Sequence, residues 1–289
     1  IPVIYRTLEG ATVVNTGAYG FHLDRVSNVV LDGFTVTGCA TGLYATFTMD
    51  CRLANGASCG NSAMGVVFGR TQSVAIEGMS ICSNGTGGVF FDNGSAGKTT
   101  VDRCRIFEHY RNGSSFGIGS YDISSKLPIR ITNSDIFHNY AGVSATYSLT
   151  RLENCVIYGN RDGIALNVSL VVVPVVNCIL SGNVRGLAEN NTTPEFACTN
   201  CCFFANSTAH YYDNDSKANL TTVAQINALT DVACANNIES DPGYRNAAAG
   251  DFRIARTSPC HDAGTTATDL TLDLYGGRRR VGPAVDVGS

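Results

Sequence analysis

Short apolar runs that end in asparagine recur along most of the chain. Five have the form apolar–x–x–Asn, at 81–84, 136–139, 157–160, 180–183 and 203–206, and segments 36–39 and 106–109 fit the same frame with another last residue. Each unit then returns with a glycine followed by an apolar residue, as in Gly142-Val143 and Gly163-Ile164. The last positions of these segments lie 21 to 30 residues apart, except across a gap of 45 that ends at Asn84. In that gap we expect an insertion around 49–64.

A period of twenty-odd residues that contains alternation of period two is typical of one coil of a parallel β-solenoid. Helical repeats need longer units and a 3.6-residue period, which this chain lacks. The pattern therefore predicts an all-β fold of about seven to nine coils over residues 1–210. Residues 211–289 are expected to form an irregular capping region of the same domain, with one short helix near 220–229.

The alternation assigns a direction to each column of equivalent residues. One column lies two positions before the apolar residue that opens each apolar–x–x–Asn segment, and it should point inward. The cysteines in this column are Cys104, Cys155, Cys178 and Cys201. The asparagines should stack at a turn, where each amide bonds its neighbour in the next coil; they are Asn84, Asn139, Asn160, Asn183 and Asn206. We interpret both columns as structural rather than catalytic.

These repeats resemble the right-handed parallel β-helix superfamily, the pectin-lyase-like fold. The segments 237–244, 250–254 and 258–264, the last reading Ser258-Pro259-Cys260-His261-Asp262-Ala263-Gly264, are similar to the closing signature of secreted bacterial β-helix-repeat proteins. The resemblance implies a right-handed β-helix, secreted or displayed at a cell surface. It implies no active site.

The composition narrows the classes of partner. Charged residues make up 15% of the chain, the net charge is −4 and the mean hydropathy is +0.05. This balance gives no electrostatic basis for binding nucleic acid, and no apolar run is long enough to span a membrane. No signal peptide is visible, so a secreted form would be a mature chain or a fragment.

Twelve cysteines indicate an oxidising compartment rather than a zinc site, because no pair of CxxC motifs has zinc-site spacing. We predict no metal ligand. Eight cysteines outside the inward column are disulfide candidates: Cys39, Cys51, Cys59, Cys82, Cys198, Cys202, Cys234 and Cys260. The pair Cys51 and Cys59 is our first choice, since both would close the same glycine-rich loop.

Seven asparagines in Asn-x-Ser/Thr motifs are expected in turns and are candidate glycosylation sites. They are Asn93, Asn112, Asn167, Asn190, Asn191, Asn214 and Asn219. Two further motifs, at Asn84 and Asn206, fall in the inward asparagine column and should be inaccessible.

Enzymes of the superfamily cleave or epimerise acidic polysaccharides or hydrolyse glycosidic bonds. A lyase site on this chain would be Asp102 and Glu153 holding Ca²⁺, with Arg105 or Arg130 as the base. The alternative, which we favour, is that these acidic and basic residues pair across an exposed turn. Apart from that possible Ca²⁺, we expect no cofactor.

One outward column is unusually aromatic and includes Phe107, Phe137, Tyr158 and Phe204. Isolated soluble proteins avoid an exposed apolar strip of this kind. The C-terminal segment could fold back over it, with Val223 and Ile226 of the short helix packing there. A neighbouring subunit or a sugar could also cover it.

The chain is therefore expected to be a non-catalytic extracellular β-helix used for surface structure, adhesion or filament assembly. Strand-like segments at both ends favour self-association by head-to-tail stacking. Loss of flanking sequence would explain the same segments equally well. A polysaccharide lyase acting on acidic glycan is the first alternative. A glycan-binding module that uses the aromatic column is the second.

Overall fold

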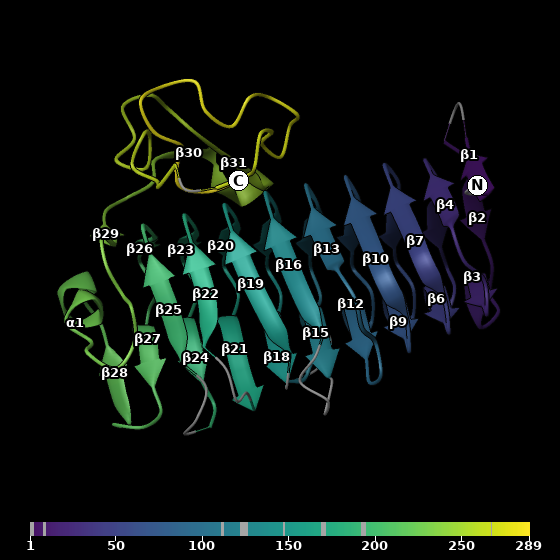
Figure 1. The fold of residues 1–289 in the computed structure, drawn as a ribbon, viewed down its shortest axis with the longest axis horizontal. Helices are drawn as coiled ribbons and strands as arrows, with labels where there is room; N and C mark the ends of the chain where they lie inside the picture. Colours follow the sequence, from purple (N-terminus) through teal and green to yellow (C-terminus); the bar gives the residue numbers. More distant parts are fainter. Residues whose placement is uncertain are drawn as a thin grey trace.

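The protein is a solenoid of three parallel sheets that run along its long axis (Figure 1). The computed structural model describes residues 3–7, 10–110, 113–121, 127–146, 148–168, 172–191, 195–266 and 268–289. Within these residues, nine successive triplets of strands, from β1–β2–β3 to β25–β26–β27, each place one strand in every sheet. The predicted β-solenoid of seven to nine coils is confirmed.

Sheet A contains β1 (Val3–Arg6), β4 (Val29–Asp32), β7 (Met49–Ala54), β10 (Gln72–Glu77), β13 (Thr99–Asp102), β16 (Pro128–Thr132), β19 (Leu149–Glu153), β22 (Val173–Val176) and β25 (Phe196–Thr199). Sheet B contains β2 (Thr12–Val14), β5 (Thr35–Thr37), β8 (Ala57–Cys59), β11 (Ser80–Cys82), β14 (Arg105–Phe107), β17 (Asp135–Phe137), β20 (Val156–Tyr158), β23 (Ile179–Ser181), β26 (Cys202–Phe204) and β29 (Ile238–Glu239). Sheet C contains β3 (Tyr19–Asp24), β6 (Thr41–Thr46), β9 (Met64–Gly69), β12 (Gly87–Asp92), β15 (Phe116–Tyr121), β18 (Ala141–Thr146), β21 (Asp162–Val168), β24 (Arg185–Glu189), β27 (Ala209–Asp213) and β28 (Ala218–Leu220).

The core is a stack of like side chains along the solenoid axis. Ile81, Ile106 and Ile136 are register partners on β11, β14 and β17, and all three are fully buried. The same alternation buries one aliphatic row from each sheet in a single continuous cluster. Because every coil repeats the same inward positions, the period-two pattern of the sequence is enough to specify the core.

The segment expected as an insertion is instead a complete coil. β7, β8 and β9 take their places in the three sheets, in register with β10, β11 and β12. The apolar–x–x–Asn pattern fails there because Ser58 occupies the position that isoleucine or leucine holds elsewhere. Its hydroxyl donates to the Gly65 carbonyl at 2.8 Å, which satisfies a buried polar group without an aliphatic side chain.

A short helix closes the C-terminal end of the core. After β27, the chain turns back through the antiparallel strand β28 and forms α1 (Val223–Asn227), which begins with a capping box between Thr222 and Gln225. Val223 and Ile226 are buried in the main core cluster. The helix therefore forms where it was predicted, but it packs against the end of the solenoid and not on the aromatic column.

The chain then runs back along the outside of the solenoid. This segment, residues 240–266 and 268–289, is called the arm; it contains the hairpin of β30 (Tyr244–Asn246) and β31 (Asp251–Ile254), joined by the 3₁₀ turn η1 (Ala247–Ala249). Figure 1 shows it in yellow above the C-terminal coils. The described residues include no helix with the length and apolarity that a membrane span requires.

Candidate functional site

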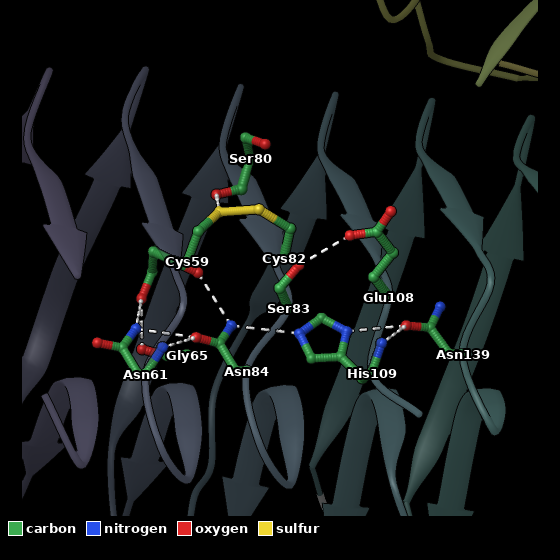
Figure 2. Close-up of a disulfide and its surroundings, with 11 residues drawn as sticks. Cys59, Asn61, Gly65, Ser80, Cys82, Ser83, Asn84, Glu108, His109 and Asn139 are labelled. Atoms are coloured by element: carbon green, nitrogen blue, oxygen red, sulfur yellow. Dashed lines mark hydrogen bonds between the residues drawn. A yellow bond between two sulfur atoms is a disulfide. The ribbon is translucent and has the colours of Figure 1, made fainter. Parts of the chain in front are cut away.

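The asparagine column forms a continuous hydrogen-bonded file at the turn between sheets B and C. The Asn160 side-chain oxygen accepts from the backbone N–H of Asn139 at 2.9 Å and from its side-chain amide at 3.1 Å. Asn183 and Asn206 repeat this arrangement one coil further on. The structure also adds Asn61, which bonds Asn84 in the same way (Figure 2). The file satisfies turn backbone groups inside the protein, so it is not available for chemistry.

His109 replaces an asparagine in this file without breaking it. Its backbone N–H and its Nδ1 atom both lie within hydrogen-bond distance of the Asn139 side-chain oxygen, and its Nε2 lies 3.2 Å from the Asn84 amide nitrogen. With Nδ1 protonated, the neutral ring donates on one side and accepts on the other. Burial lowers the pKa of His109 to about 4, so it is a neutral structural residue at physiological pH.

The disulfide differs from our first choice. Cys59 is bonded to Cys82, its register partner on the next coil, and not to Cys51 (Figure 2). The expectation failed because Cys51 and Cys59 lie on different strands of a regular coil, not at the ends of a loop. Cys51 and Cys39 are buried thiols that donate to the carbonyls of Met49 and Thr37. The four cysteines of the inward column are fully buried thiols: Cys104, Cys155, Cys178 and Cys201.

A second asparagine column lies at the turn between sheets A and B, and it binds the arm. Asn133, Asn154, Asn177 and Asn200 all have φ near +50°, a conformation that asparagine tolerates better than most residues. Asn177 bonds both backbone groups of Thr265, at 2.8 and 3.0 Å. Asn154 donates to the Asp286 carbonyl and Asn200 to the Ala263 carbonyl. These four asparagines recur at intervals of 21 to 23 residues in the sequence, but their contacts with the arm are not encoded in that spacing.

The arm covers most of the aromatic column. Phe107 and Phe137 stack with ring centroids 4.7 Å apart, and Phe252 of the arm packs against Phe137 and Tyr158 at 5.1 Å. Phe137 is 4% exposed and Phe252 is 3% exposed. Phe204 is half-buried at the edge of the arm. The column is therefore part of a second core and not an exposed platform for sugar.

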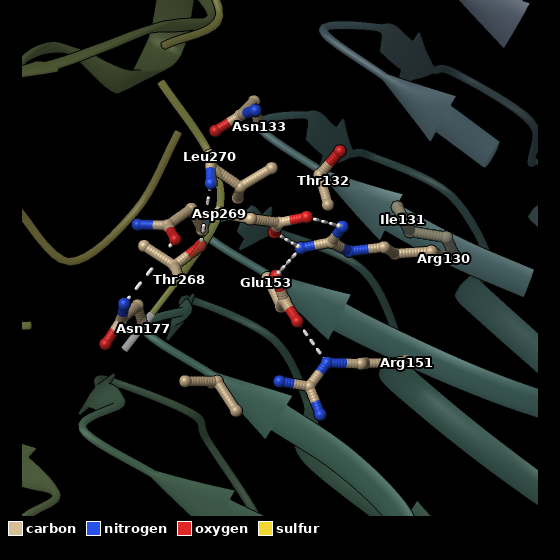
Figure 3. A network of polar contacts seen from close by, with 12 residues as sticks. Arg130, Ile131, Thr132, Asn133, Arg151, Glu153, Asn177, Thr268, Asp269 and Leu270 are labelled. Atoms are coloured by element: carbon tan, nitrogen blue, oxygen red, sulfur yellow. Dashed lines mark hydrogen bonds and ion pairs between the residues drawn. The ribbon is translucent and has the colours of Figure 1, made fainter. Parts of the chain in front are cut away.

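Charged residues along sheet A form an ion-pair network that includes one residue from the arm (Figure 3). Glu153, which is 3% exposed, accepts from Arg130 and from Arg151. Arg130 also pairs with Asp269 of the arm. The hydrogen bond to Asp269 is the largest effect on the pKa of Arg130, which it raises; the same contact lowers the pKa of Asp269 to about 2. The guanidinium of Arg130 is thus held in its charged form between two carboxylates, which makes it a poor proton acceptor.

The two acidic residues of the hypothetical lyase site do not face each other. Asp102 and Glu153 occupy the same row of sheet A, but Thr132 of the intervening strand lies between them in register. Asp102 accepts from the Thr132 hydroxyl at 2.6 Å, from the Asn133 amide at 2.9 Å and from Arg103 at 2.9 Å. Both carboxylates are therefore engaged within the protein, and the geometry does not form the shared Ca²⁺ position that the sequence allowed.

Arg105, the other candidate base, is also engaged by the arm. Its guanidinium donates to the Gly250 carbonyl at 2.7 Å and lies over the Phe137 ring at 5.3 Å. The neighbouring Asp135 is fully buried, and its second oxygen finds no hydrogen-bond donor; Arg105 is 3.8 Å away. At that distance the cation does not offset burial, which raises the pKa of Asp135 to about 7.

The outer face of sheet C carries a polar groove of about 360 Å³. Its floor consists of small side chains in register, Ser144 on β18 and Ala165 on β21. One wall contains Tyr140 and Arg161, whose guanidinium lies over the tyrosine ring at 4.7 Å from its centroid. Arg161 forms no ion pair with any residue that the structure describes. The groove therefore holds an uncompensated positive charge beside an aromatic face.

The rest of the groove supplies neutral and paired polar groups. Asp162 and Arg185 form a two-pronged ion pair at 2.6 and 2.9 Å. Opposite them, the Asn167 amide donates to the Ser144 hydroxyl at 2.9 Å and its oxygen accepts from Asn190 at 3.0 Å. The groove was not predictable from the sequence, because Tyr140 and Arg161 directly follow the ladder asparagines in a column that otherwise shows no chemical pattern.

The glycosylation candidates differ in exposure. Asn190 and Asn219 are exposed, Asn93, Asn167 and Asn191 are half-buried, and Asn214 is 7% exposed, so this last one is not the accessible turn residue that we expected. Asn112 lies outside the described residues. Of the two ladder motifs, Asn84 is fully buried, and Asn206 is only partly exposed.

One group of potential metal ligands lies in the arm. His261, Asp262 and Asp286 place their ligand atoms within 4.8 Å of one another. Asp286 accepts from the Asp262 backbone N–H at 2.9 Å, and Asp262 accepts from the Ala284 N–H at 3.3 Å. These hydrogen bonds explain why the residues lie close together, as parts of the loop that closes the arm.

Comparison with known proteins agrees with the fold. Residues 5–124 match the family model described as the right handed beta helix region. A crystal structure of the pectate lyase Pel9A superposes with a TM-score of 0.65 at 13% identity, over 99% of this chain and 85% of that one. The periplasmic alginate epimerase AlgG gives a TM-score of 0.42 at 13% identity, over 59% of this chain and 50% of that one. No curated protein sequence matches. The chain thus has the right-handed parallel β-helix fold that the repeats indicate.

Proposed function

We propose that this chain is a non-catalytic extracellular β-helix that adheres to acidic polysaccharide through the groove on sheet C. The observation that carries the proposal is Arg161, an unpaired cation on the Tyr140 ring in a groove lined with hydroxyl and amide groups. A guanidinium pairs with a carboxylate on two parallel hydrogen bonds, and the hydroxyl and amide groups of the groove bond sugar hydroxyls. A uronate residue presents both features.

The layout of the groove supports a polymer rather than a single small molecule. It crosses β18, β21 and β24, whose spacing along the solenoid axis is about 4.8 Å per strand. Ser144, Asn167 and Asn190 line one side of it and offer hydroxyl and amide groups to sugar hydroxyls. A chain molecule lying along the axis would contact polar groups from all three of these strands.

Secretion fits the same proposal. The Cys59–Cys82 bond is typical of proteins from oxidising compartments. Surface attachment, adhesion and assembly into filaments remain consistent roles for a rigid rod whose groove binds glycan.

The test is binding of polygalacturonate and alginate, with dextran as a neutral polymer, measured by calorimetry on protein freed of any N-linked glycan. Arg161→Ala should weaken binding of the acidic polymers about tenfold or more, the equivalent of one charged contact. Arg253 is a matched control, because it also lies over a tyrosine, Tyr275, but on the arm. Arg253→Ala should bind like the unmodified protein. Equal affinity of all three proteins, or no preference for acidic polymer, contradicts the proposal.

A polysaccharide lyase is the second candidate, favoured by the overlay with a pectate lyase. The same samples separate the two functions. A lyase releases an unsaturated product that absorbs in the ultraviolet, and Arg130→Ala should abolish that product. A binding protein gives no product, and Arg130→Ala leaves its affinity unchanged.

A further inference from the structure

Two cysteines meet where the short helix closes the end of the solenoid. Cys198 lies on β25 of the last coil, and Cys234 lies between α1 and β29. Their Sγ atoms are 3.0 Å apart, well inside the contact distance of two nonbonded sulfur atoms. Both residues are buried, with exposures of 0% and 6%.

The backbone holds the two cysteines in register. Thr199 and Ala235 form a parallel bridge, so Cys198 and Cys234 precede a matched pair on adjacent backbones. Cys59 and Cys82, which form a disulfide, are also direct partners on adjacent parallel backbones. The Cys198 backbone N–H also donates to the Cys234 sulfur at 3.4 Å. The chain therefore already contains one disulfide between cysteines that lie opposite each other on adjacent parallel backbones.

We propose that Cys198 and Cys234 form a disulfide in the oxidised protein, which locks the segment containing α1 onto the last coil. The link encloses residues 198–234, and that segment covers the core. Just after this segment, Asn237 bonds both the last coil, through Cys198 and Cys201, and Asn227 of α1. The segment is thus positioned by hydrogen bonds before the covalent link forms.

The oxidant is a small-molecule disulfide such as oxidised glutathione. The Cys234 thiolate attacks one sulfur of the oxidant and displaces a glutathione thiolate, which leaves a mixed disulfide. Cys198 then loses its proton, and its sulfur attacks the Cys234 sulfur and displaces the second thiolate. Two S–H bonds are exchanged for one S–S bond, and two electrons and two protons leave as two molecules of reduced glutathione.

The thiol contact supports this order of attack. The hydrogen bond from Cys198 lowers the pKa of Cys234, and the same contact raises the pKa of Cys198. Cys234 is consequently the better nucleophile. Cys234 is also the more exposed of the two sulfur-bearing residues, at 6% against 0% for Cys198, so the oxidant reaches Cys234 first.

The test is peptide mapping of the full chain after incubation with oxidised glutathione. Free thiols are blocked with N-ethylmaleimide in denaturant at acidic pH, and the protein is cut with trypsin. Cys234 is the single cysteine of peptide 218–245, and Cys198 lies in 186–217 with Cys201 and Cys202. We expect these two peptides to be joined in more than half of the molecules. Fragment ions that divide the chain between Cys198 and Cys201 identify the linked residue.

Two variants and one internal control make the result decisive. Cys198→Ser should reduce the linked peptides at least tenfold, whereas Cys201→Ser, at an equally buried position, should leave them unchanged. The link between peptides 53–70 and 71–98 reports Cys59–Cys82 and shows that oxidation has occurred. The proposal is overturned if Cys234 is recovered blocked by N-ethylmaleimide while that link is complete, or if fragment ions join Cys234 to another cysteine.

Discussion

Two outer surfaces of the same nine coils differ in exposure: the arm covers one of them, and the other is open. Around sheet B, the arm buries Phe137 beneath Phe252 and leaves Asp135 without contact with solvent. On sheet C, within the described residues, the groove with Tyr140 and Arg161 stays open. The covered surface behaves as a second core, and the open surface keeps a charged group without an ionic partner.

Residue type within a repeat therefore does not define a functional surface. The aromatic column of sheet B has the composition of a sugar platform, yet it is the floor on which the arm packs. The groove of sheet C has no aromatic column, yet it keeps accessible polar groups. A column can bind a ligand only where the arm does not cover it.

The largest expected effect comes from removing the central contact of the covered surface. Phe252 lies against Phe137, Tyr158 and Tyr244, each with ring centroids 5.1 Å from its own. Phe252→Ala should lower the free energy of unfolding by about 3–5 kcal/mol, because it leaves a cavity between aromatic rings. Urea denaturation followed by circular dichroism measures this loss.

The matched change on the open surface is Tyr140→Ala. Tyr140 is only half-buried, so its removal should cost at most about 1 kcal/mol. Similar losses for the two variants would show that the arm is a loosely attached segment and that the contrast between the two surfaces is wrong.

The next effect is a dependence of stability on pH at the covered surface. Burial raises the pKa of Asp135 to about 7 in the folded protein, above its value of about 3.9 in an unfolded chain. The folded state therefore binds more protons between these values, and stability falls as pH rises through about 7. From pH 5 to pH 8, Asp135 should account for a loss of about 2–3 kcal/mol.

Asp135→Asn is the control, because asparagine has nearly the same shape and does not ionise. Glu189, whose pKa burial also raises to about 7, contributes a similar slope in both proteins. The difference between the two urea-derived profiles therefore isolates Asp135. Parallel profiles would mean that Asp135 is ionised and paired with Arg105 at neutral pH.

The coils were predictable because each inward position is repeated. A single column of isoleucines and one of asparagines fix the strand register, since a slip by one residue would expose every apolar side chain. The pattern failed only where a polar residue replaced an aliphatic one, at Ser58, and this hid the coil from Met49 to Gly69. The wrong pairing of Cys51 with Cys59 followed directly from that missed coil.

The arm was not predictable in the same way. Its hydrogen bonds join residues that lie far apart in the sequence, such as Asn177 with Thr265 and Asn133 with Arg279. The expectation that the C-terminal segment folds back over the aromatic column is confirmed, but Phe252 of the arm packs there and Val223 and Ile226 of the helix do not. No periodic pattern encodes such contacts, so the sequence did not single out the arm. The groove was missed for a related reason: Arg161 is notable only because the structure gives it no ionic partner.

The smallest expected effect concerns the ion pair that joins the arm to sheet A. Asp269→Asn removes a carboxylate whose side chain is 74% exposed, and pairs in water contribute at most about 1 kcal/mol. We therefore expect a loss below about 1 kcal/mol that disappears in 1 M salt, where exposed charges are screened. Glu153→Gln should cost more, about 3 kcal/mol, because Glu153 is buried between two arginines. A salt-resistant loss of stability above about 2 kcal/mol for Asp269→Asn would contradict this ranking. It would mean that the ion pair of Asp269 with Arg130, and not the aromatic contacts of Phe252, holds the arm over the covered surface.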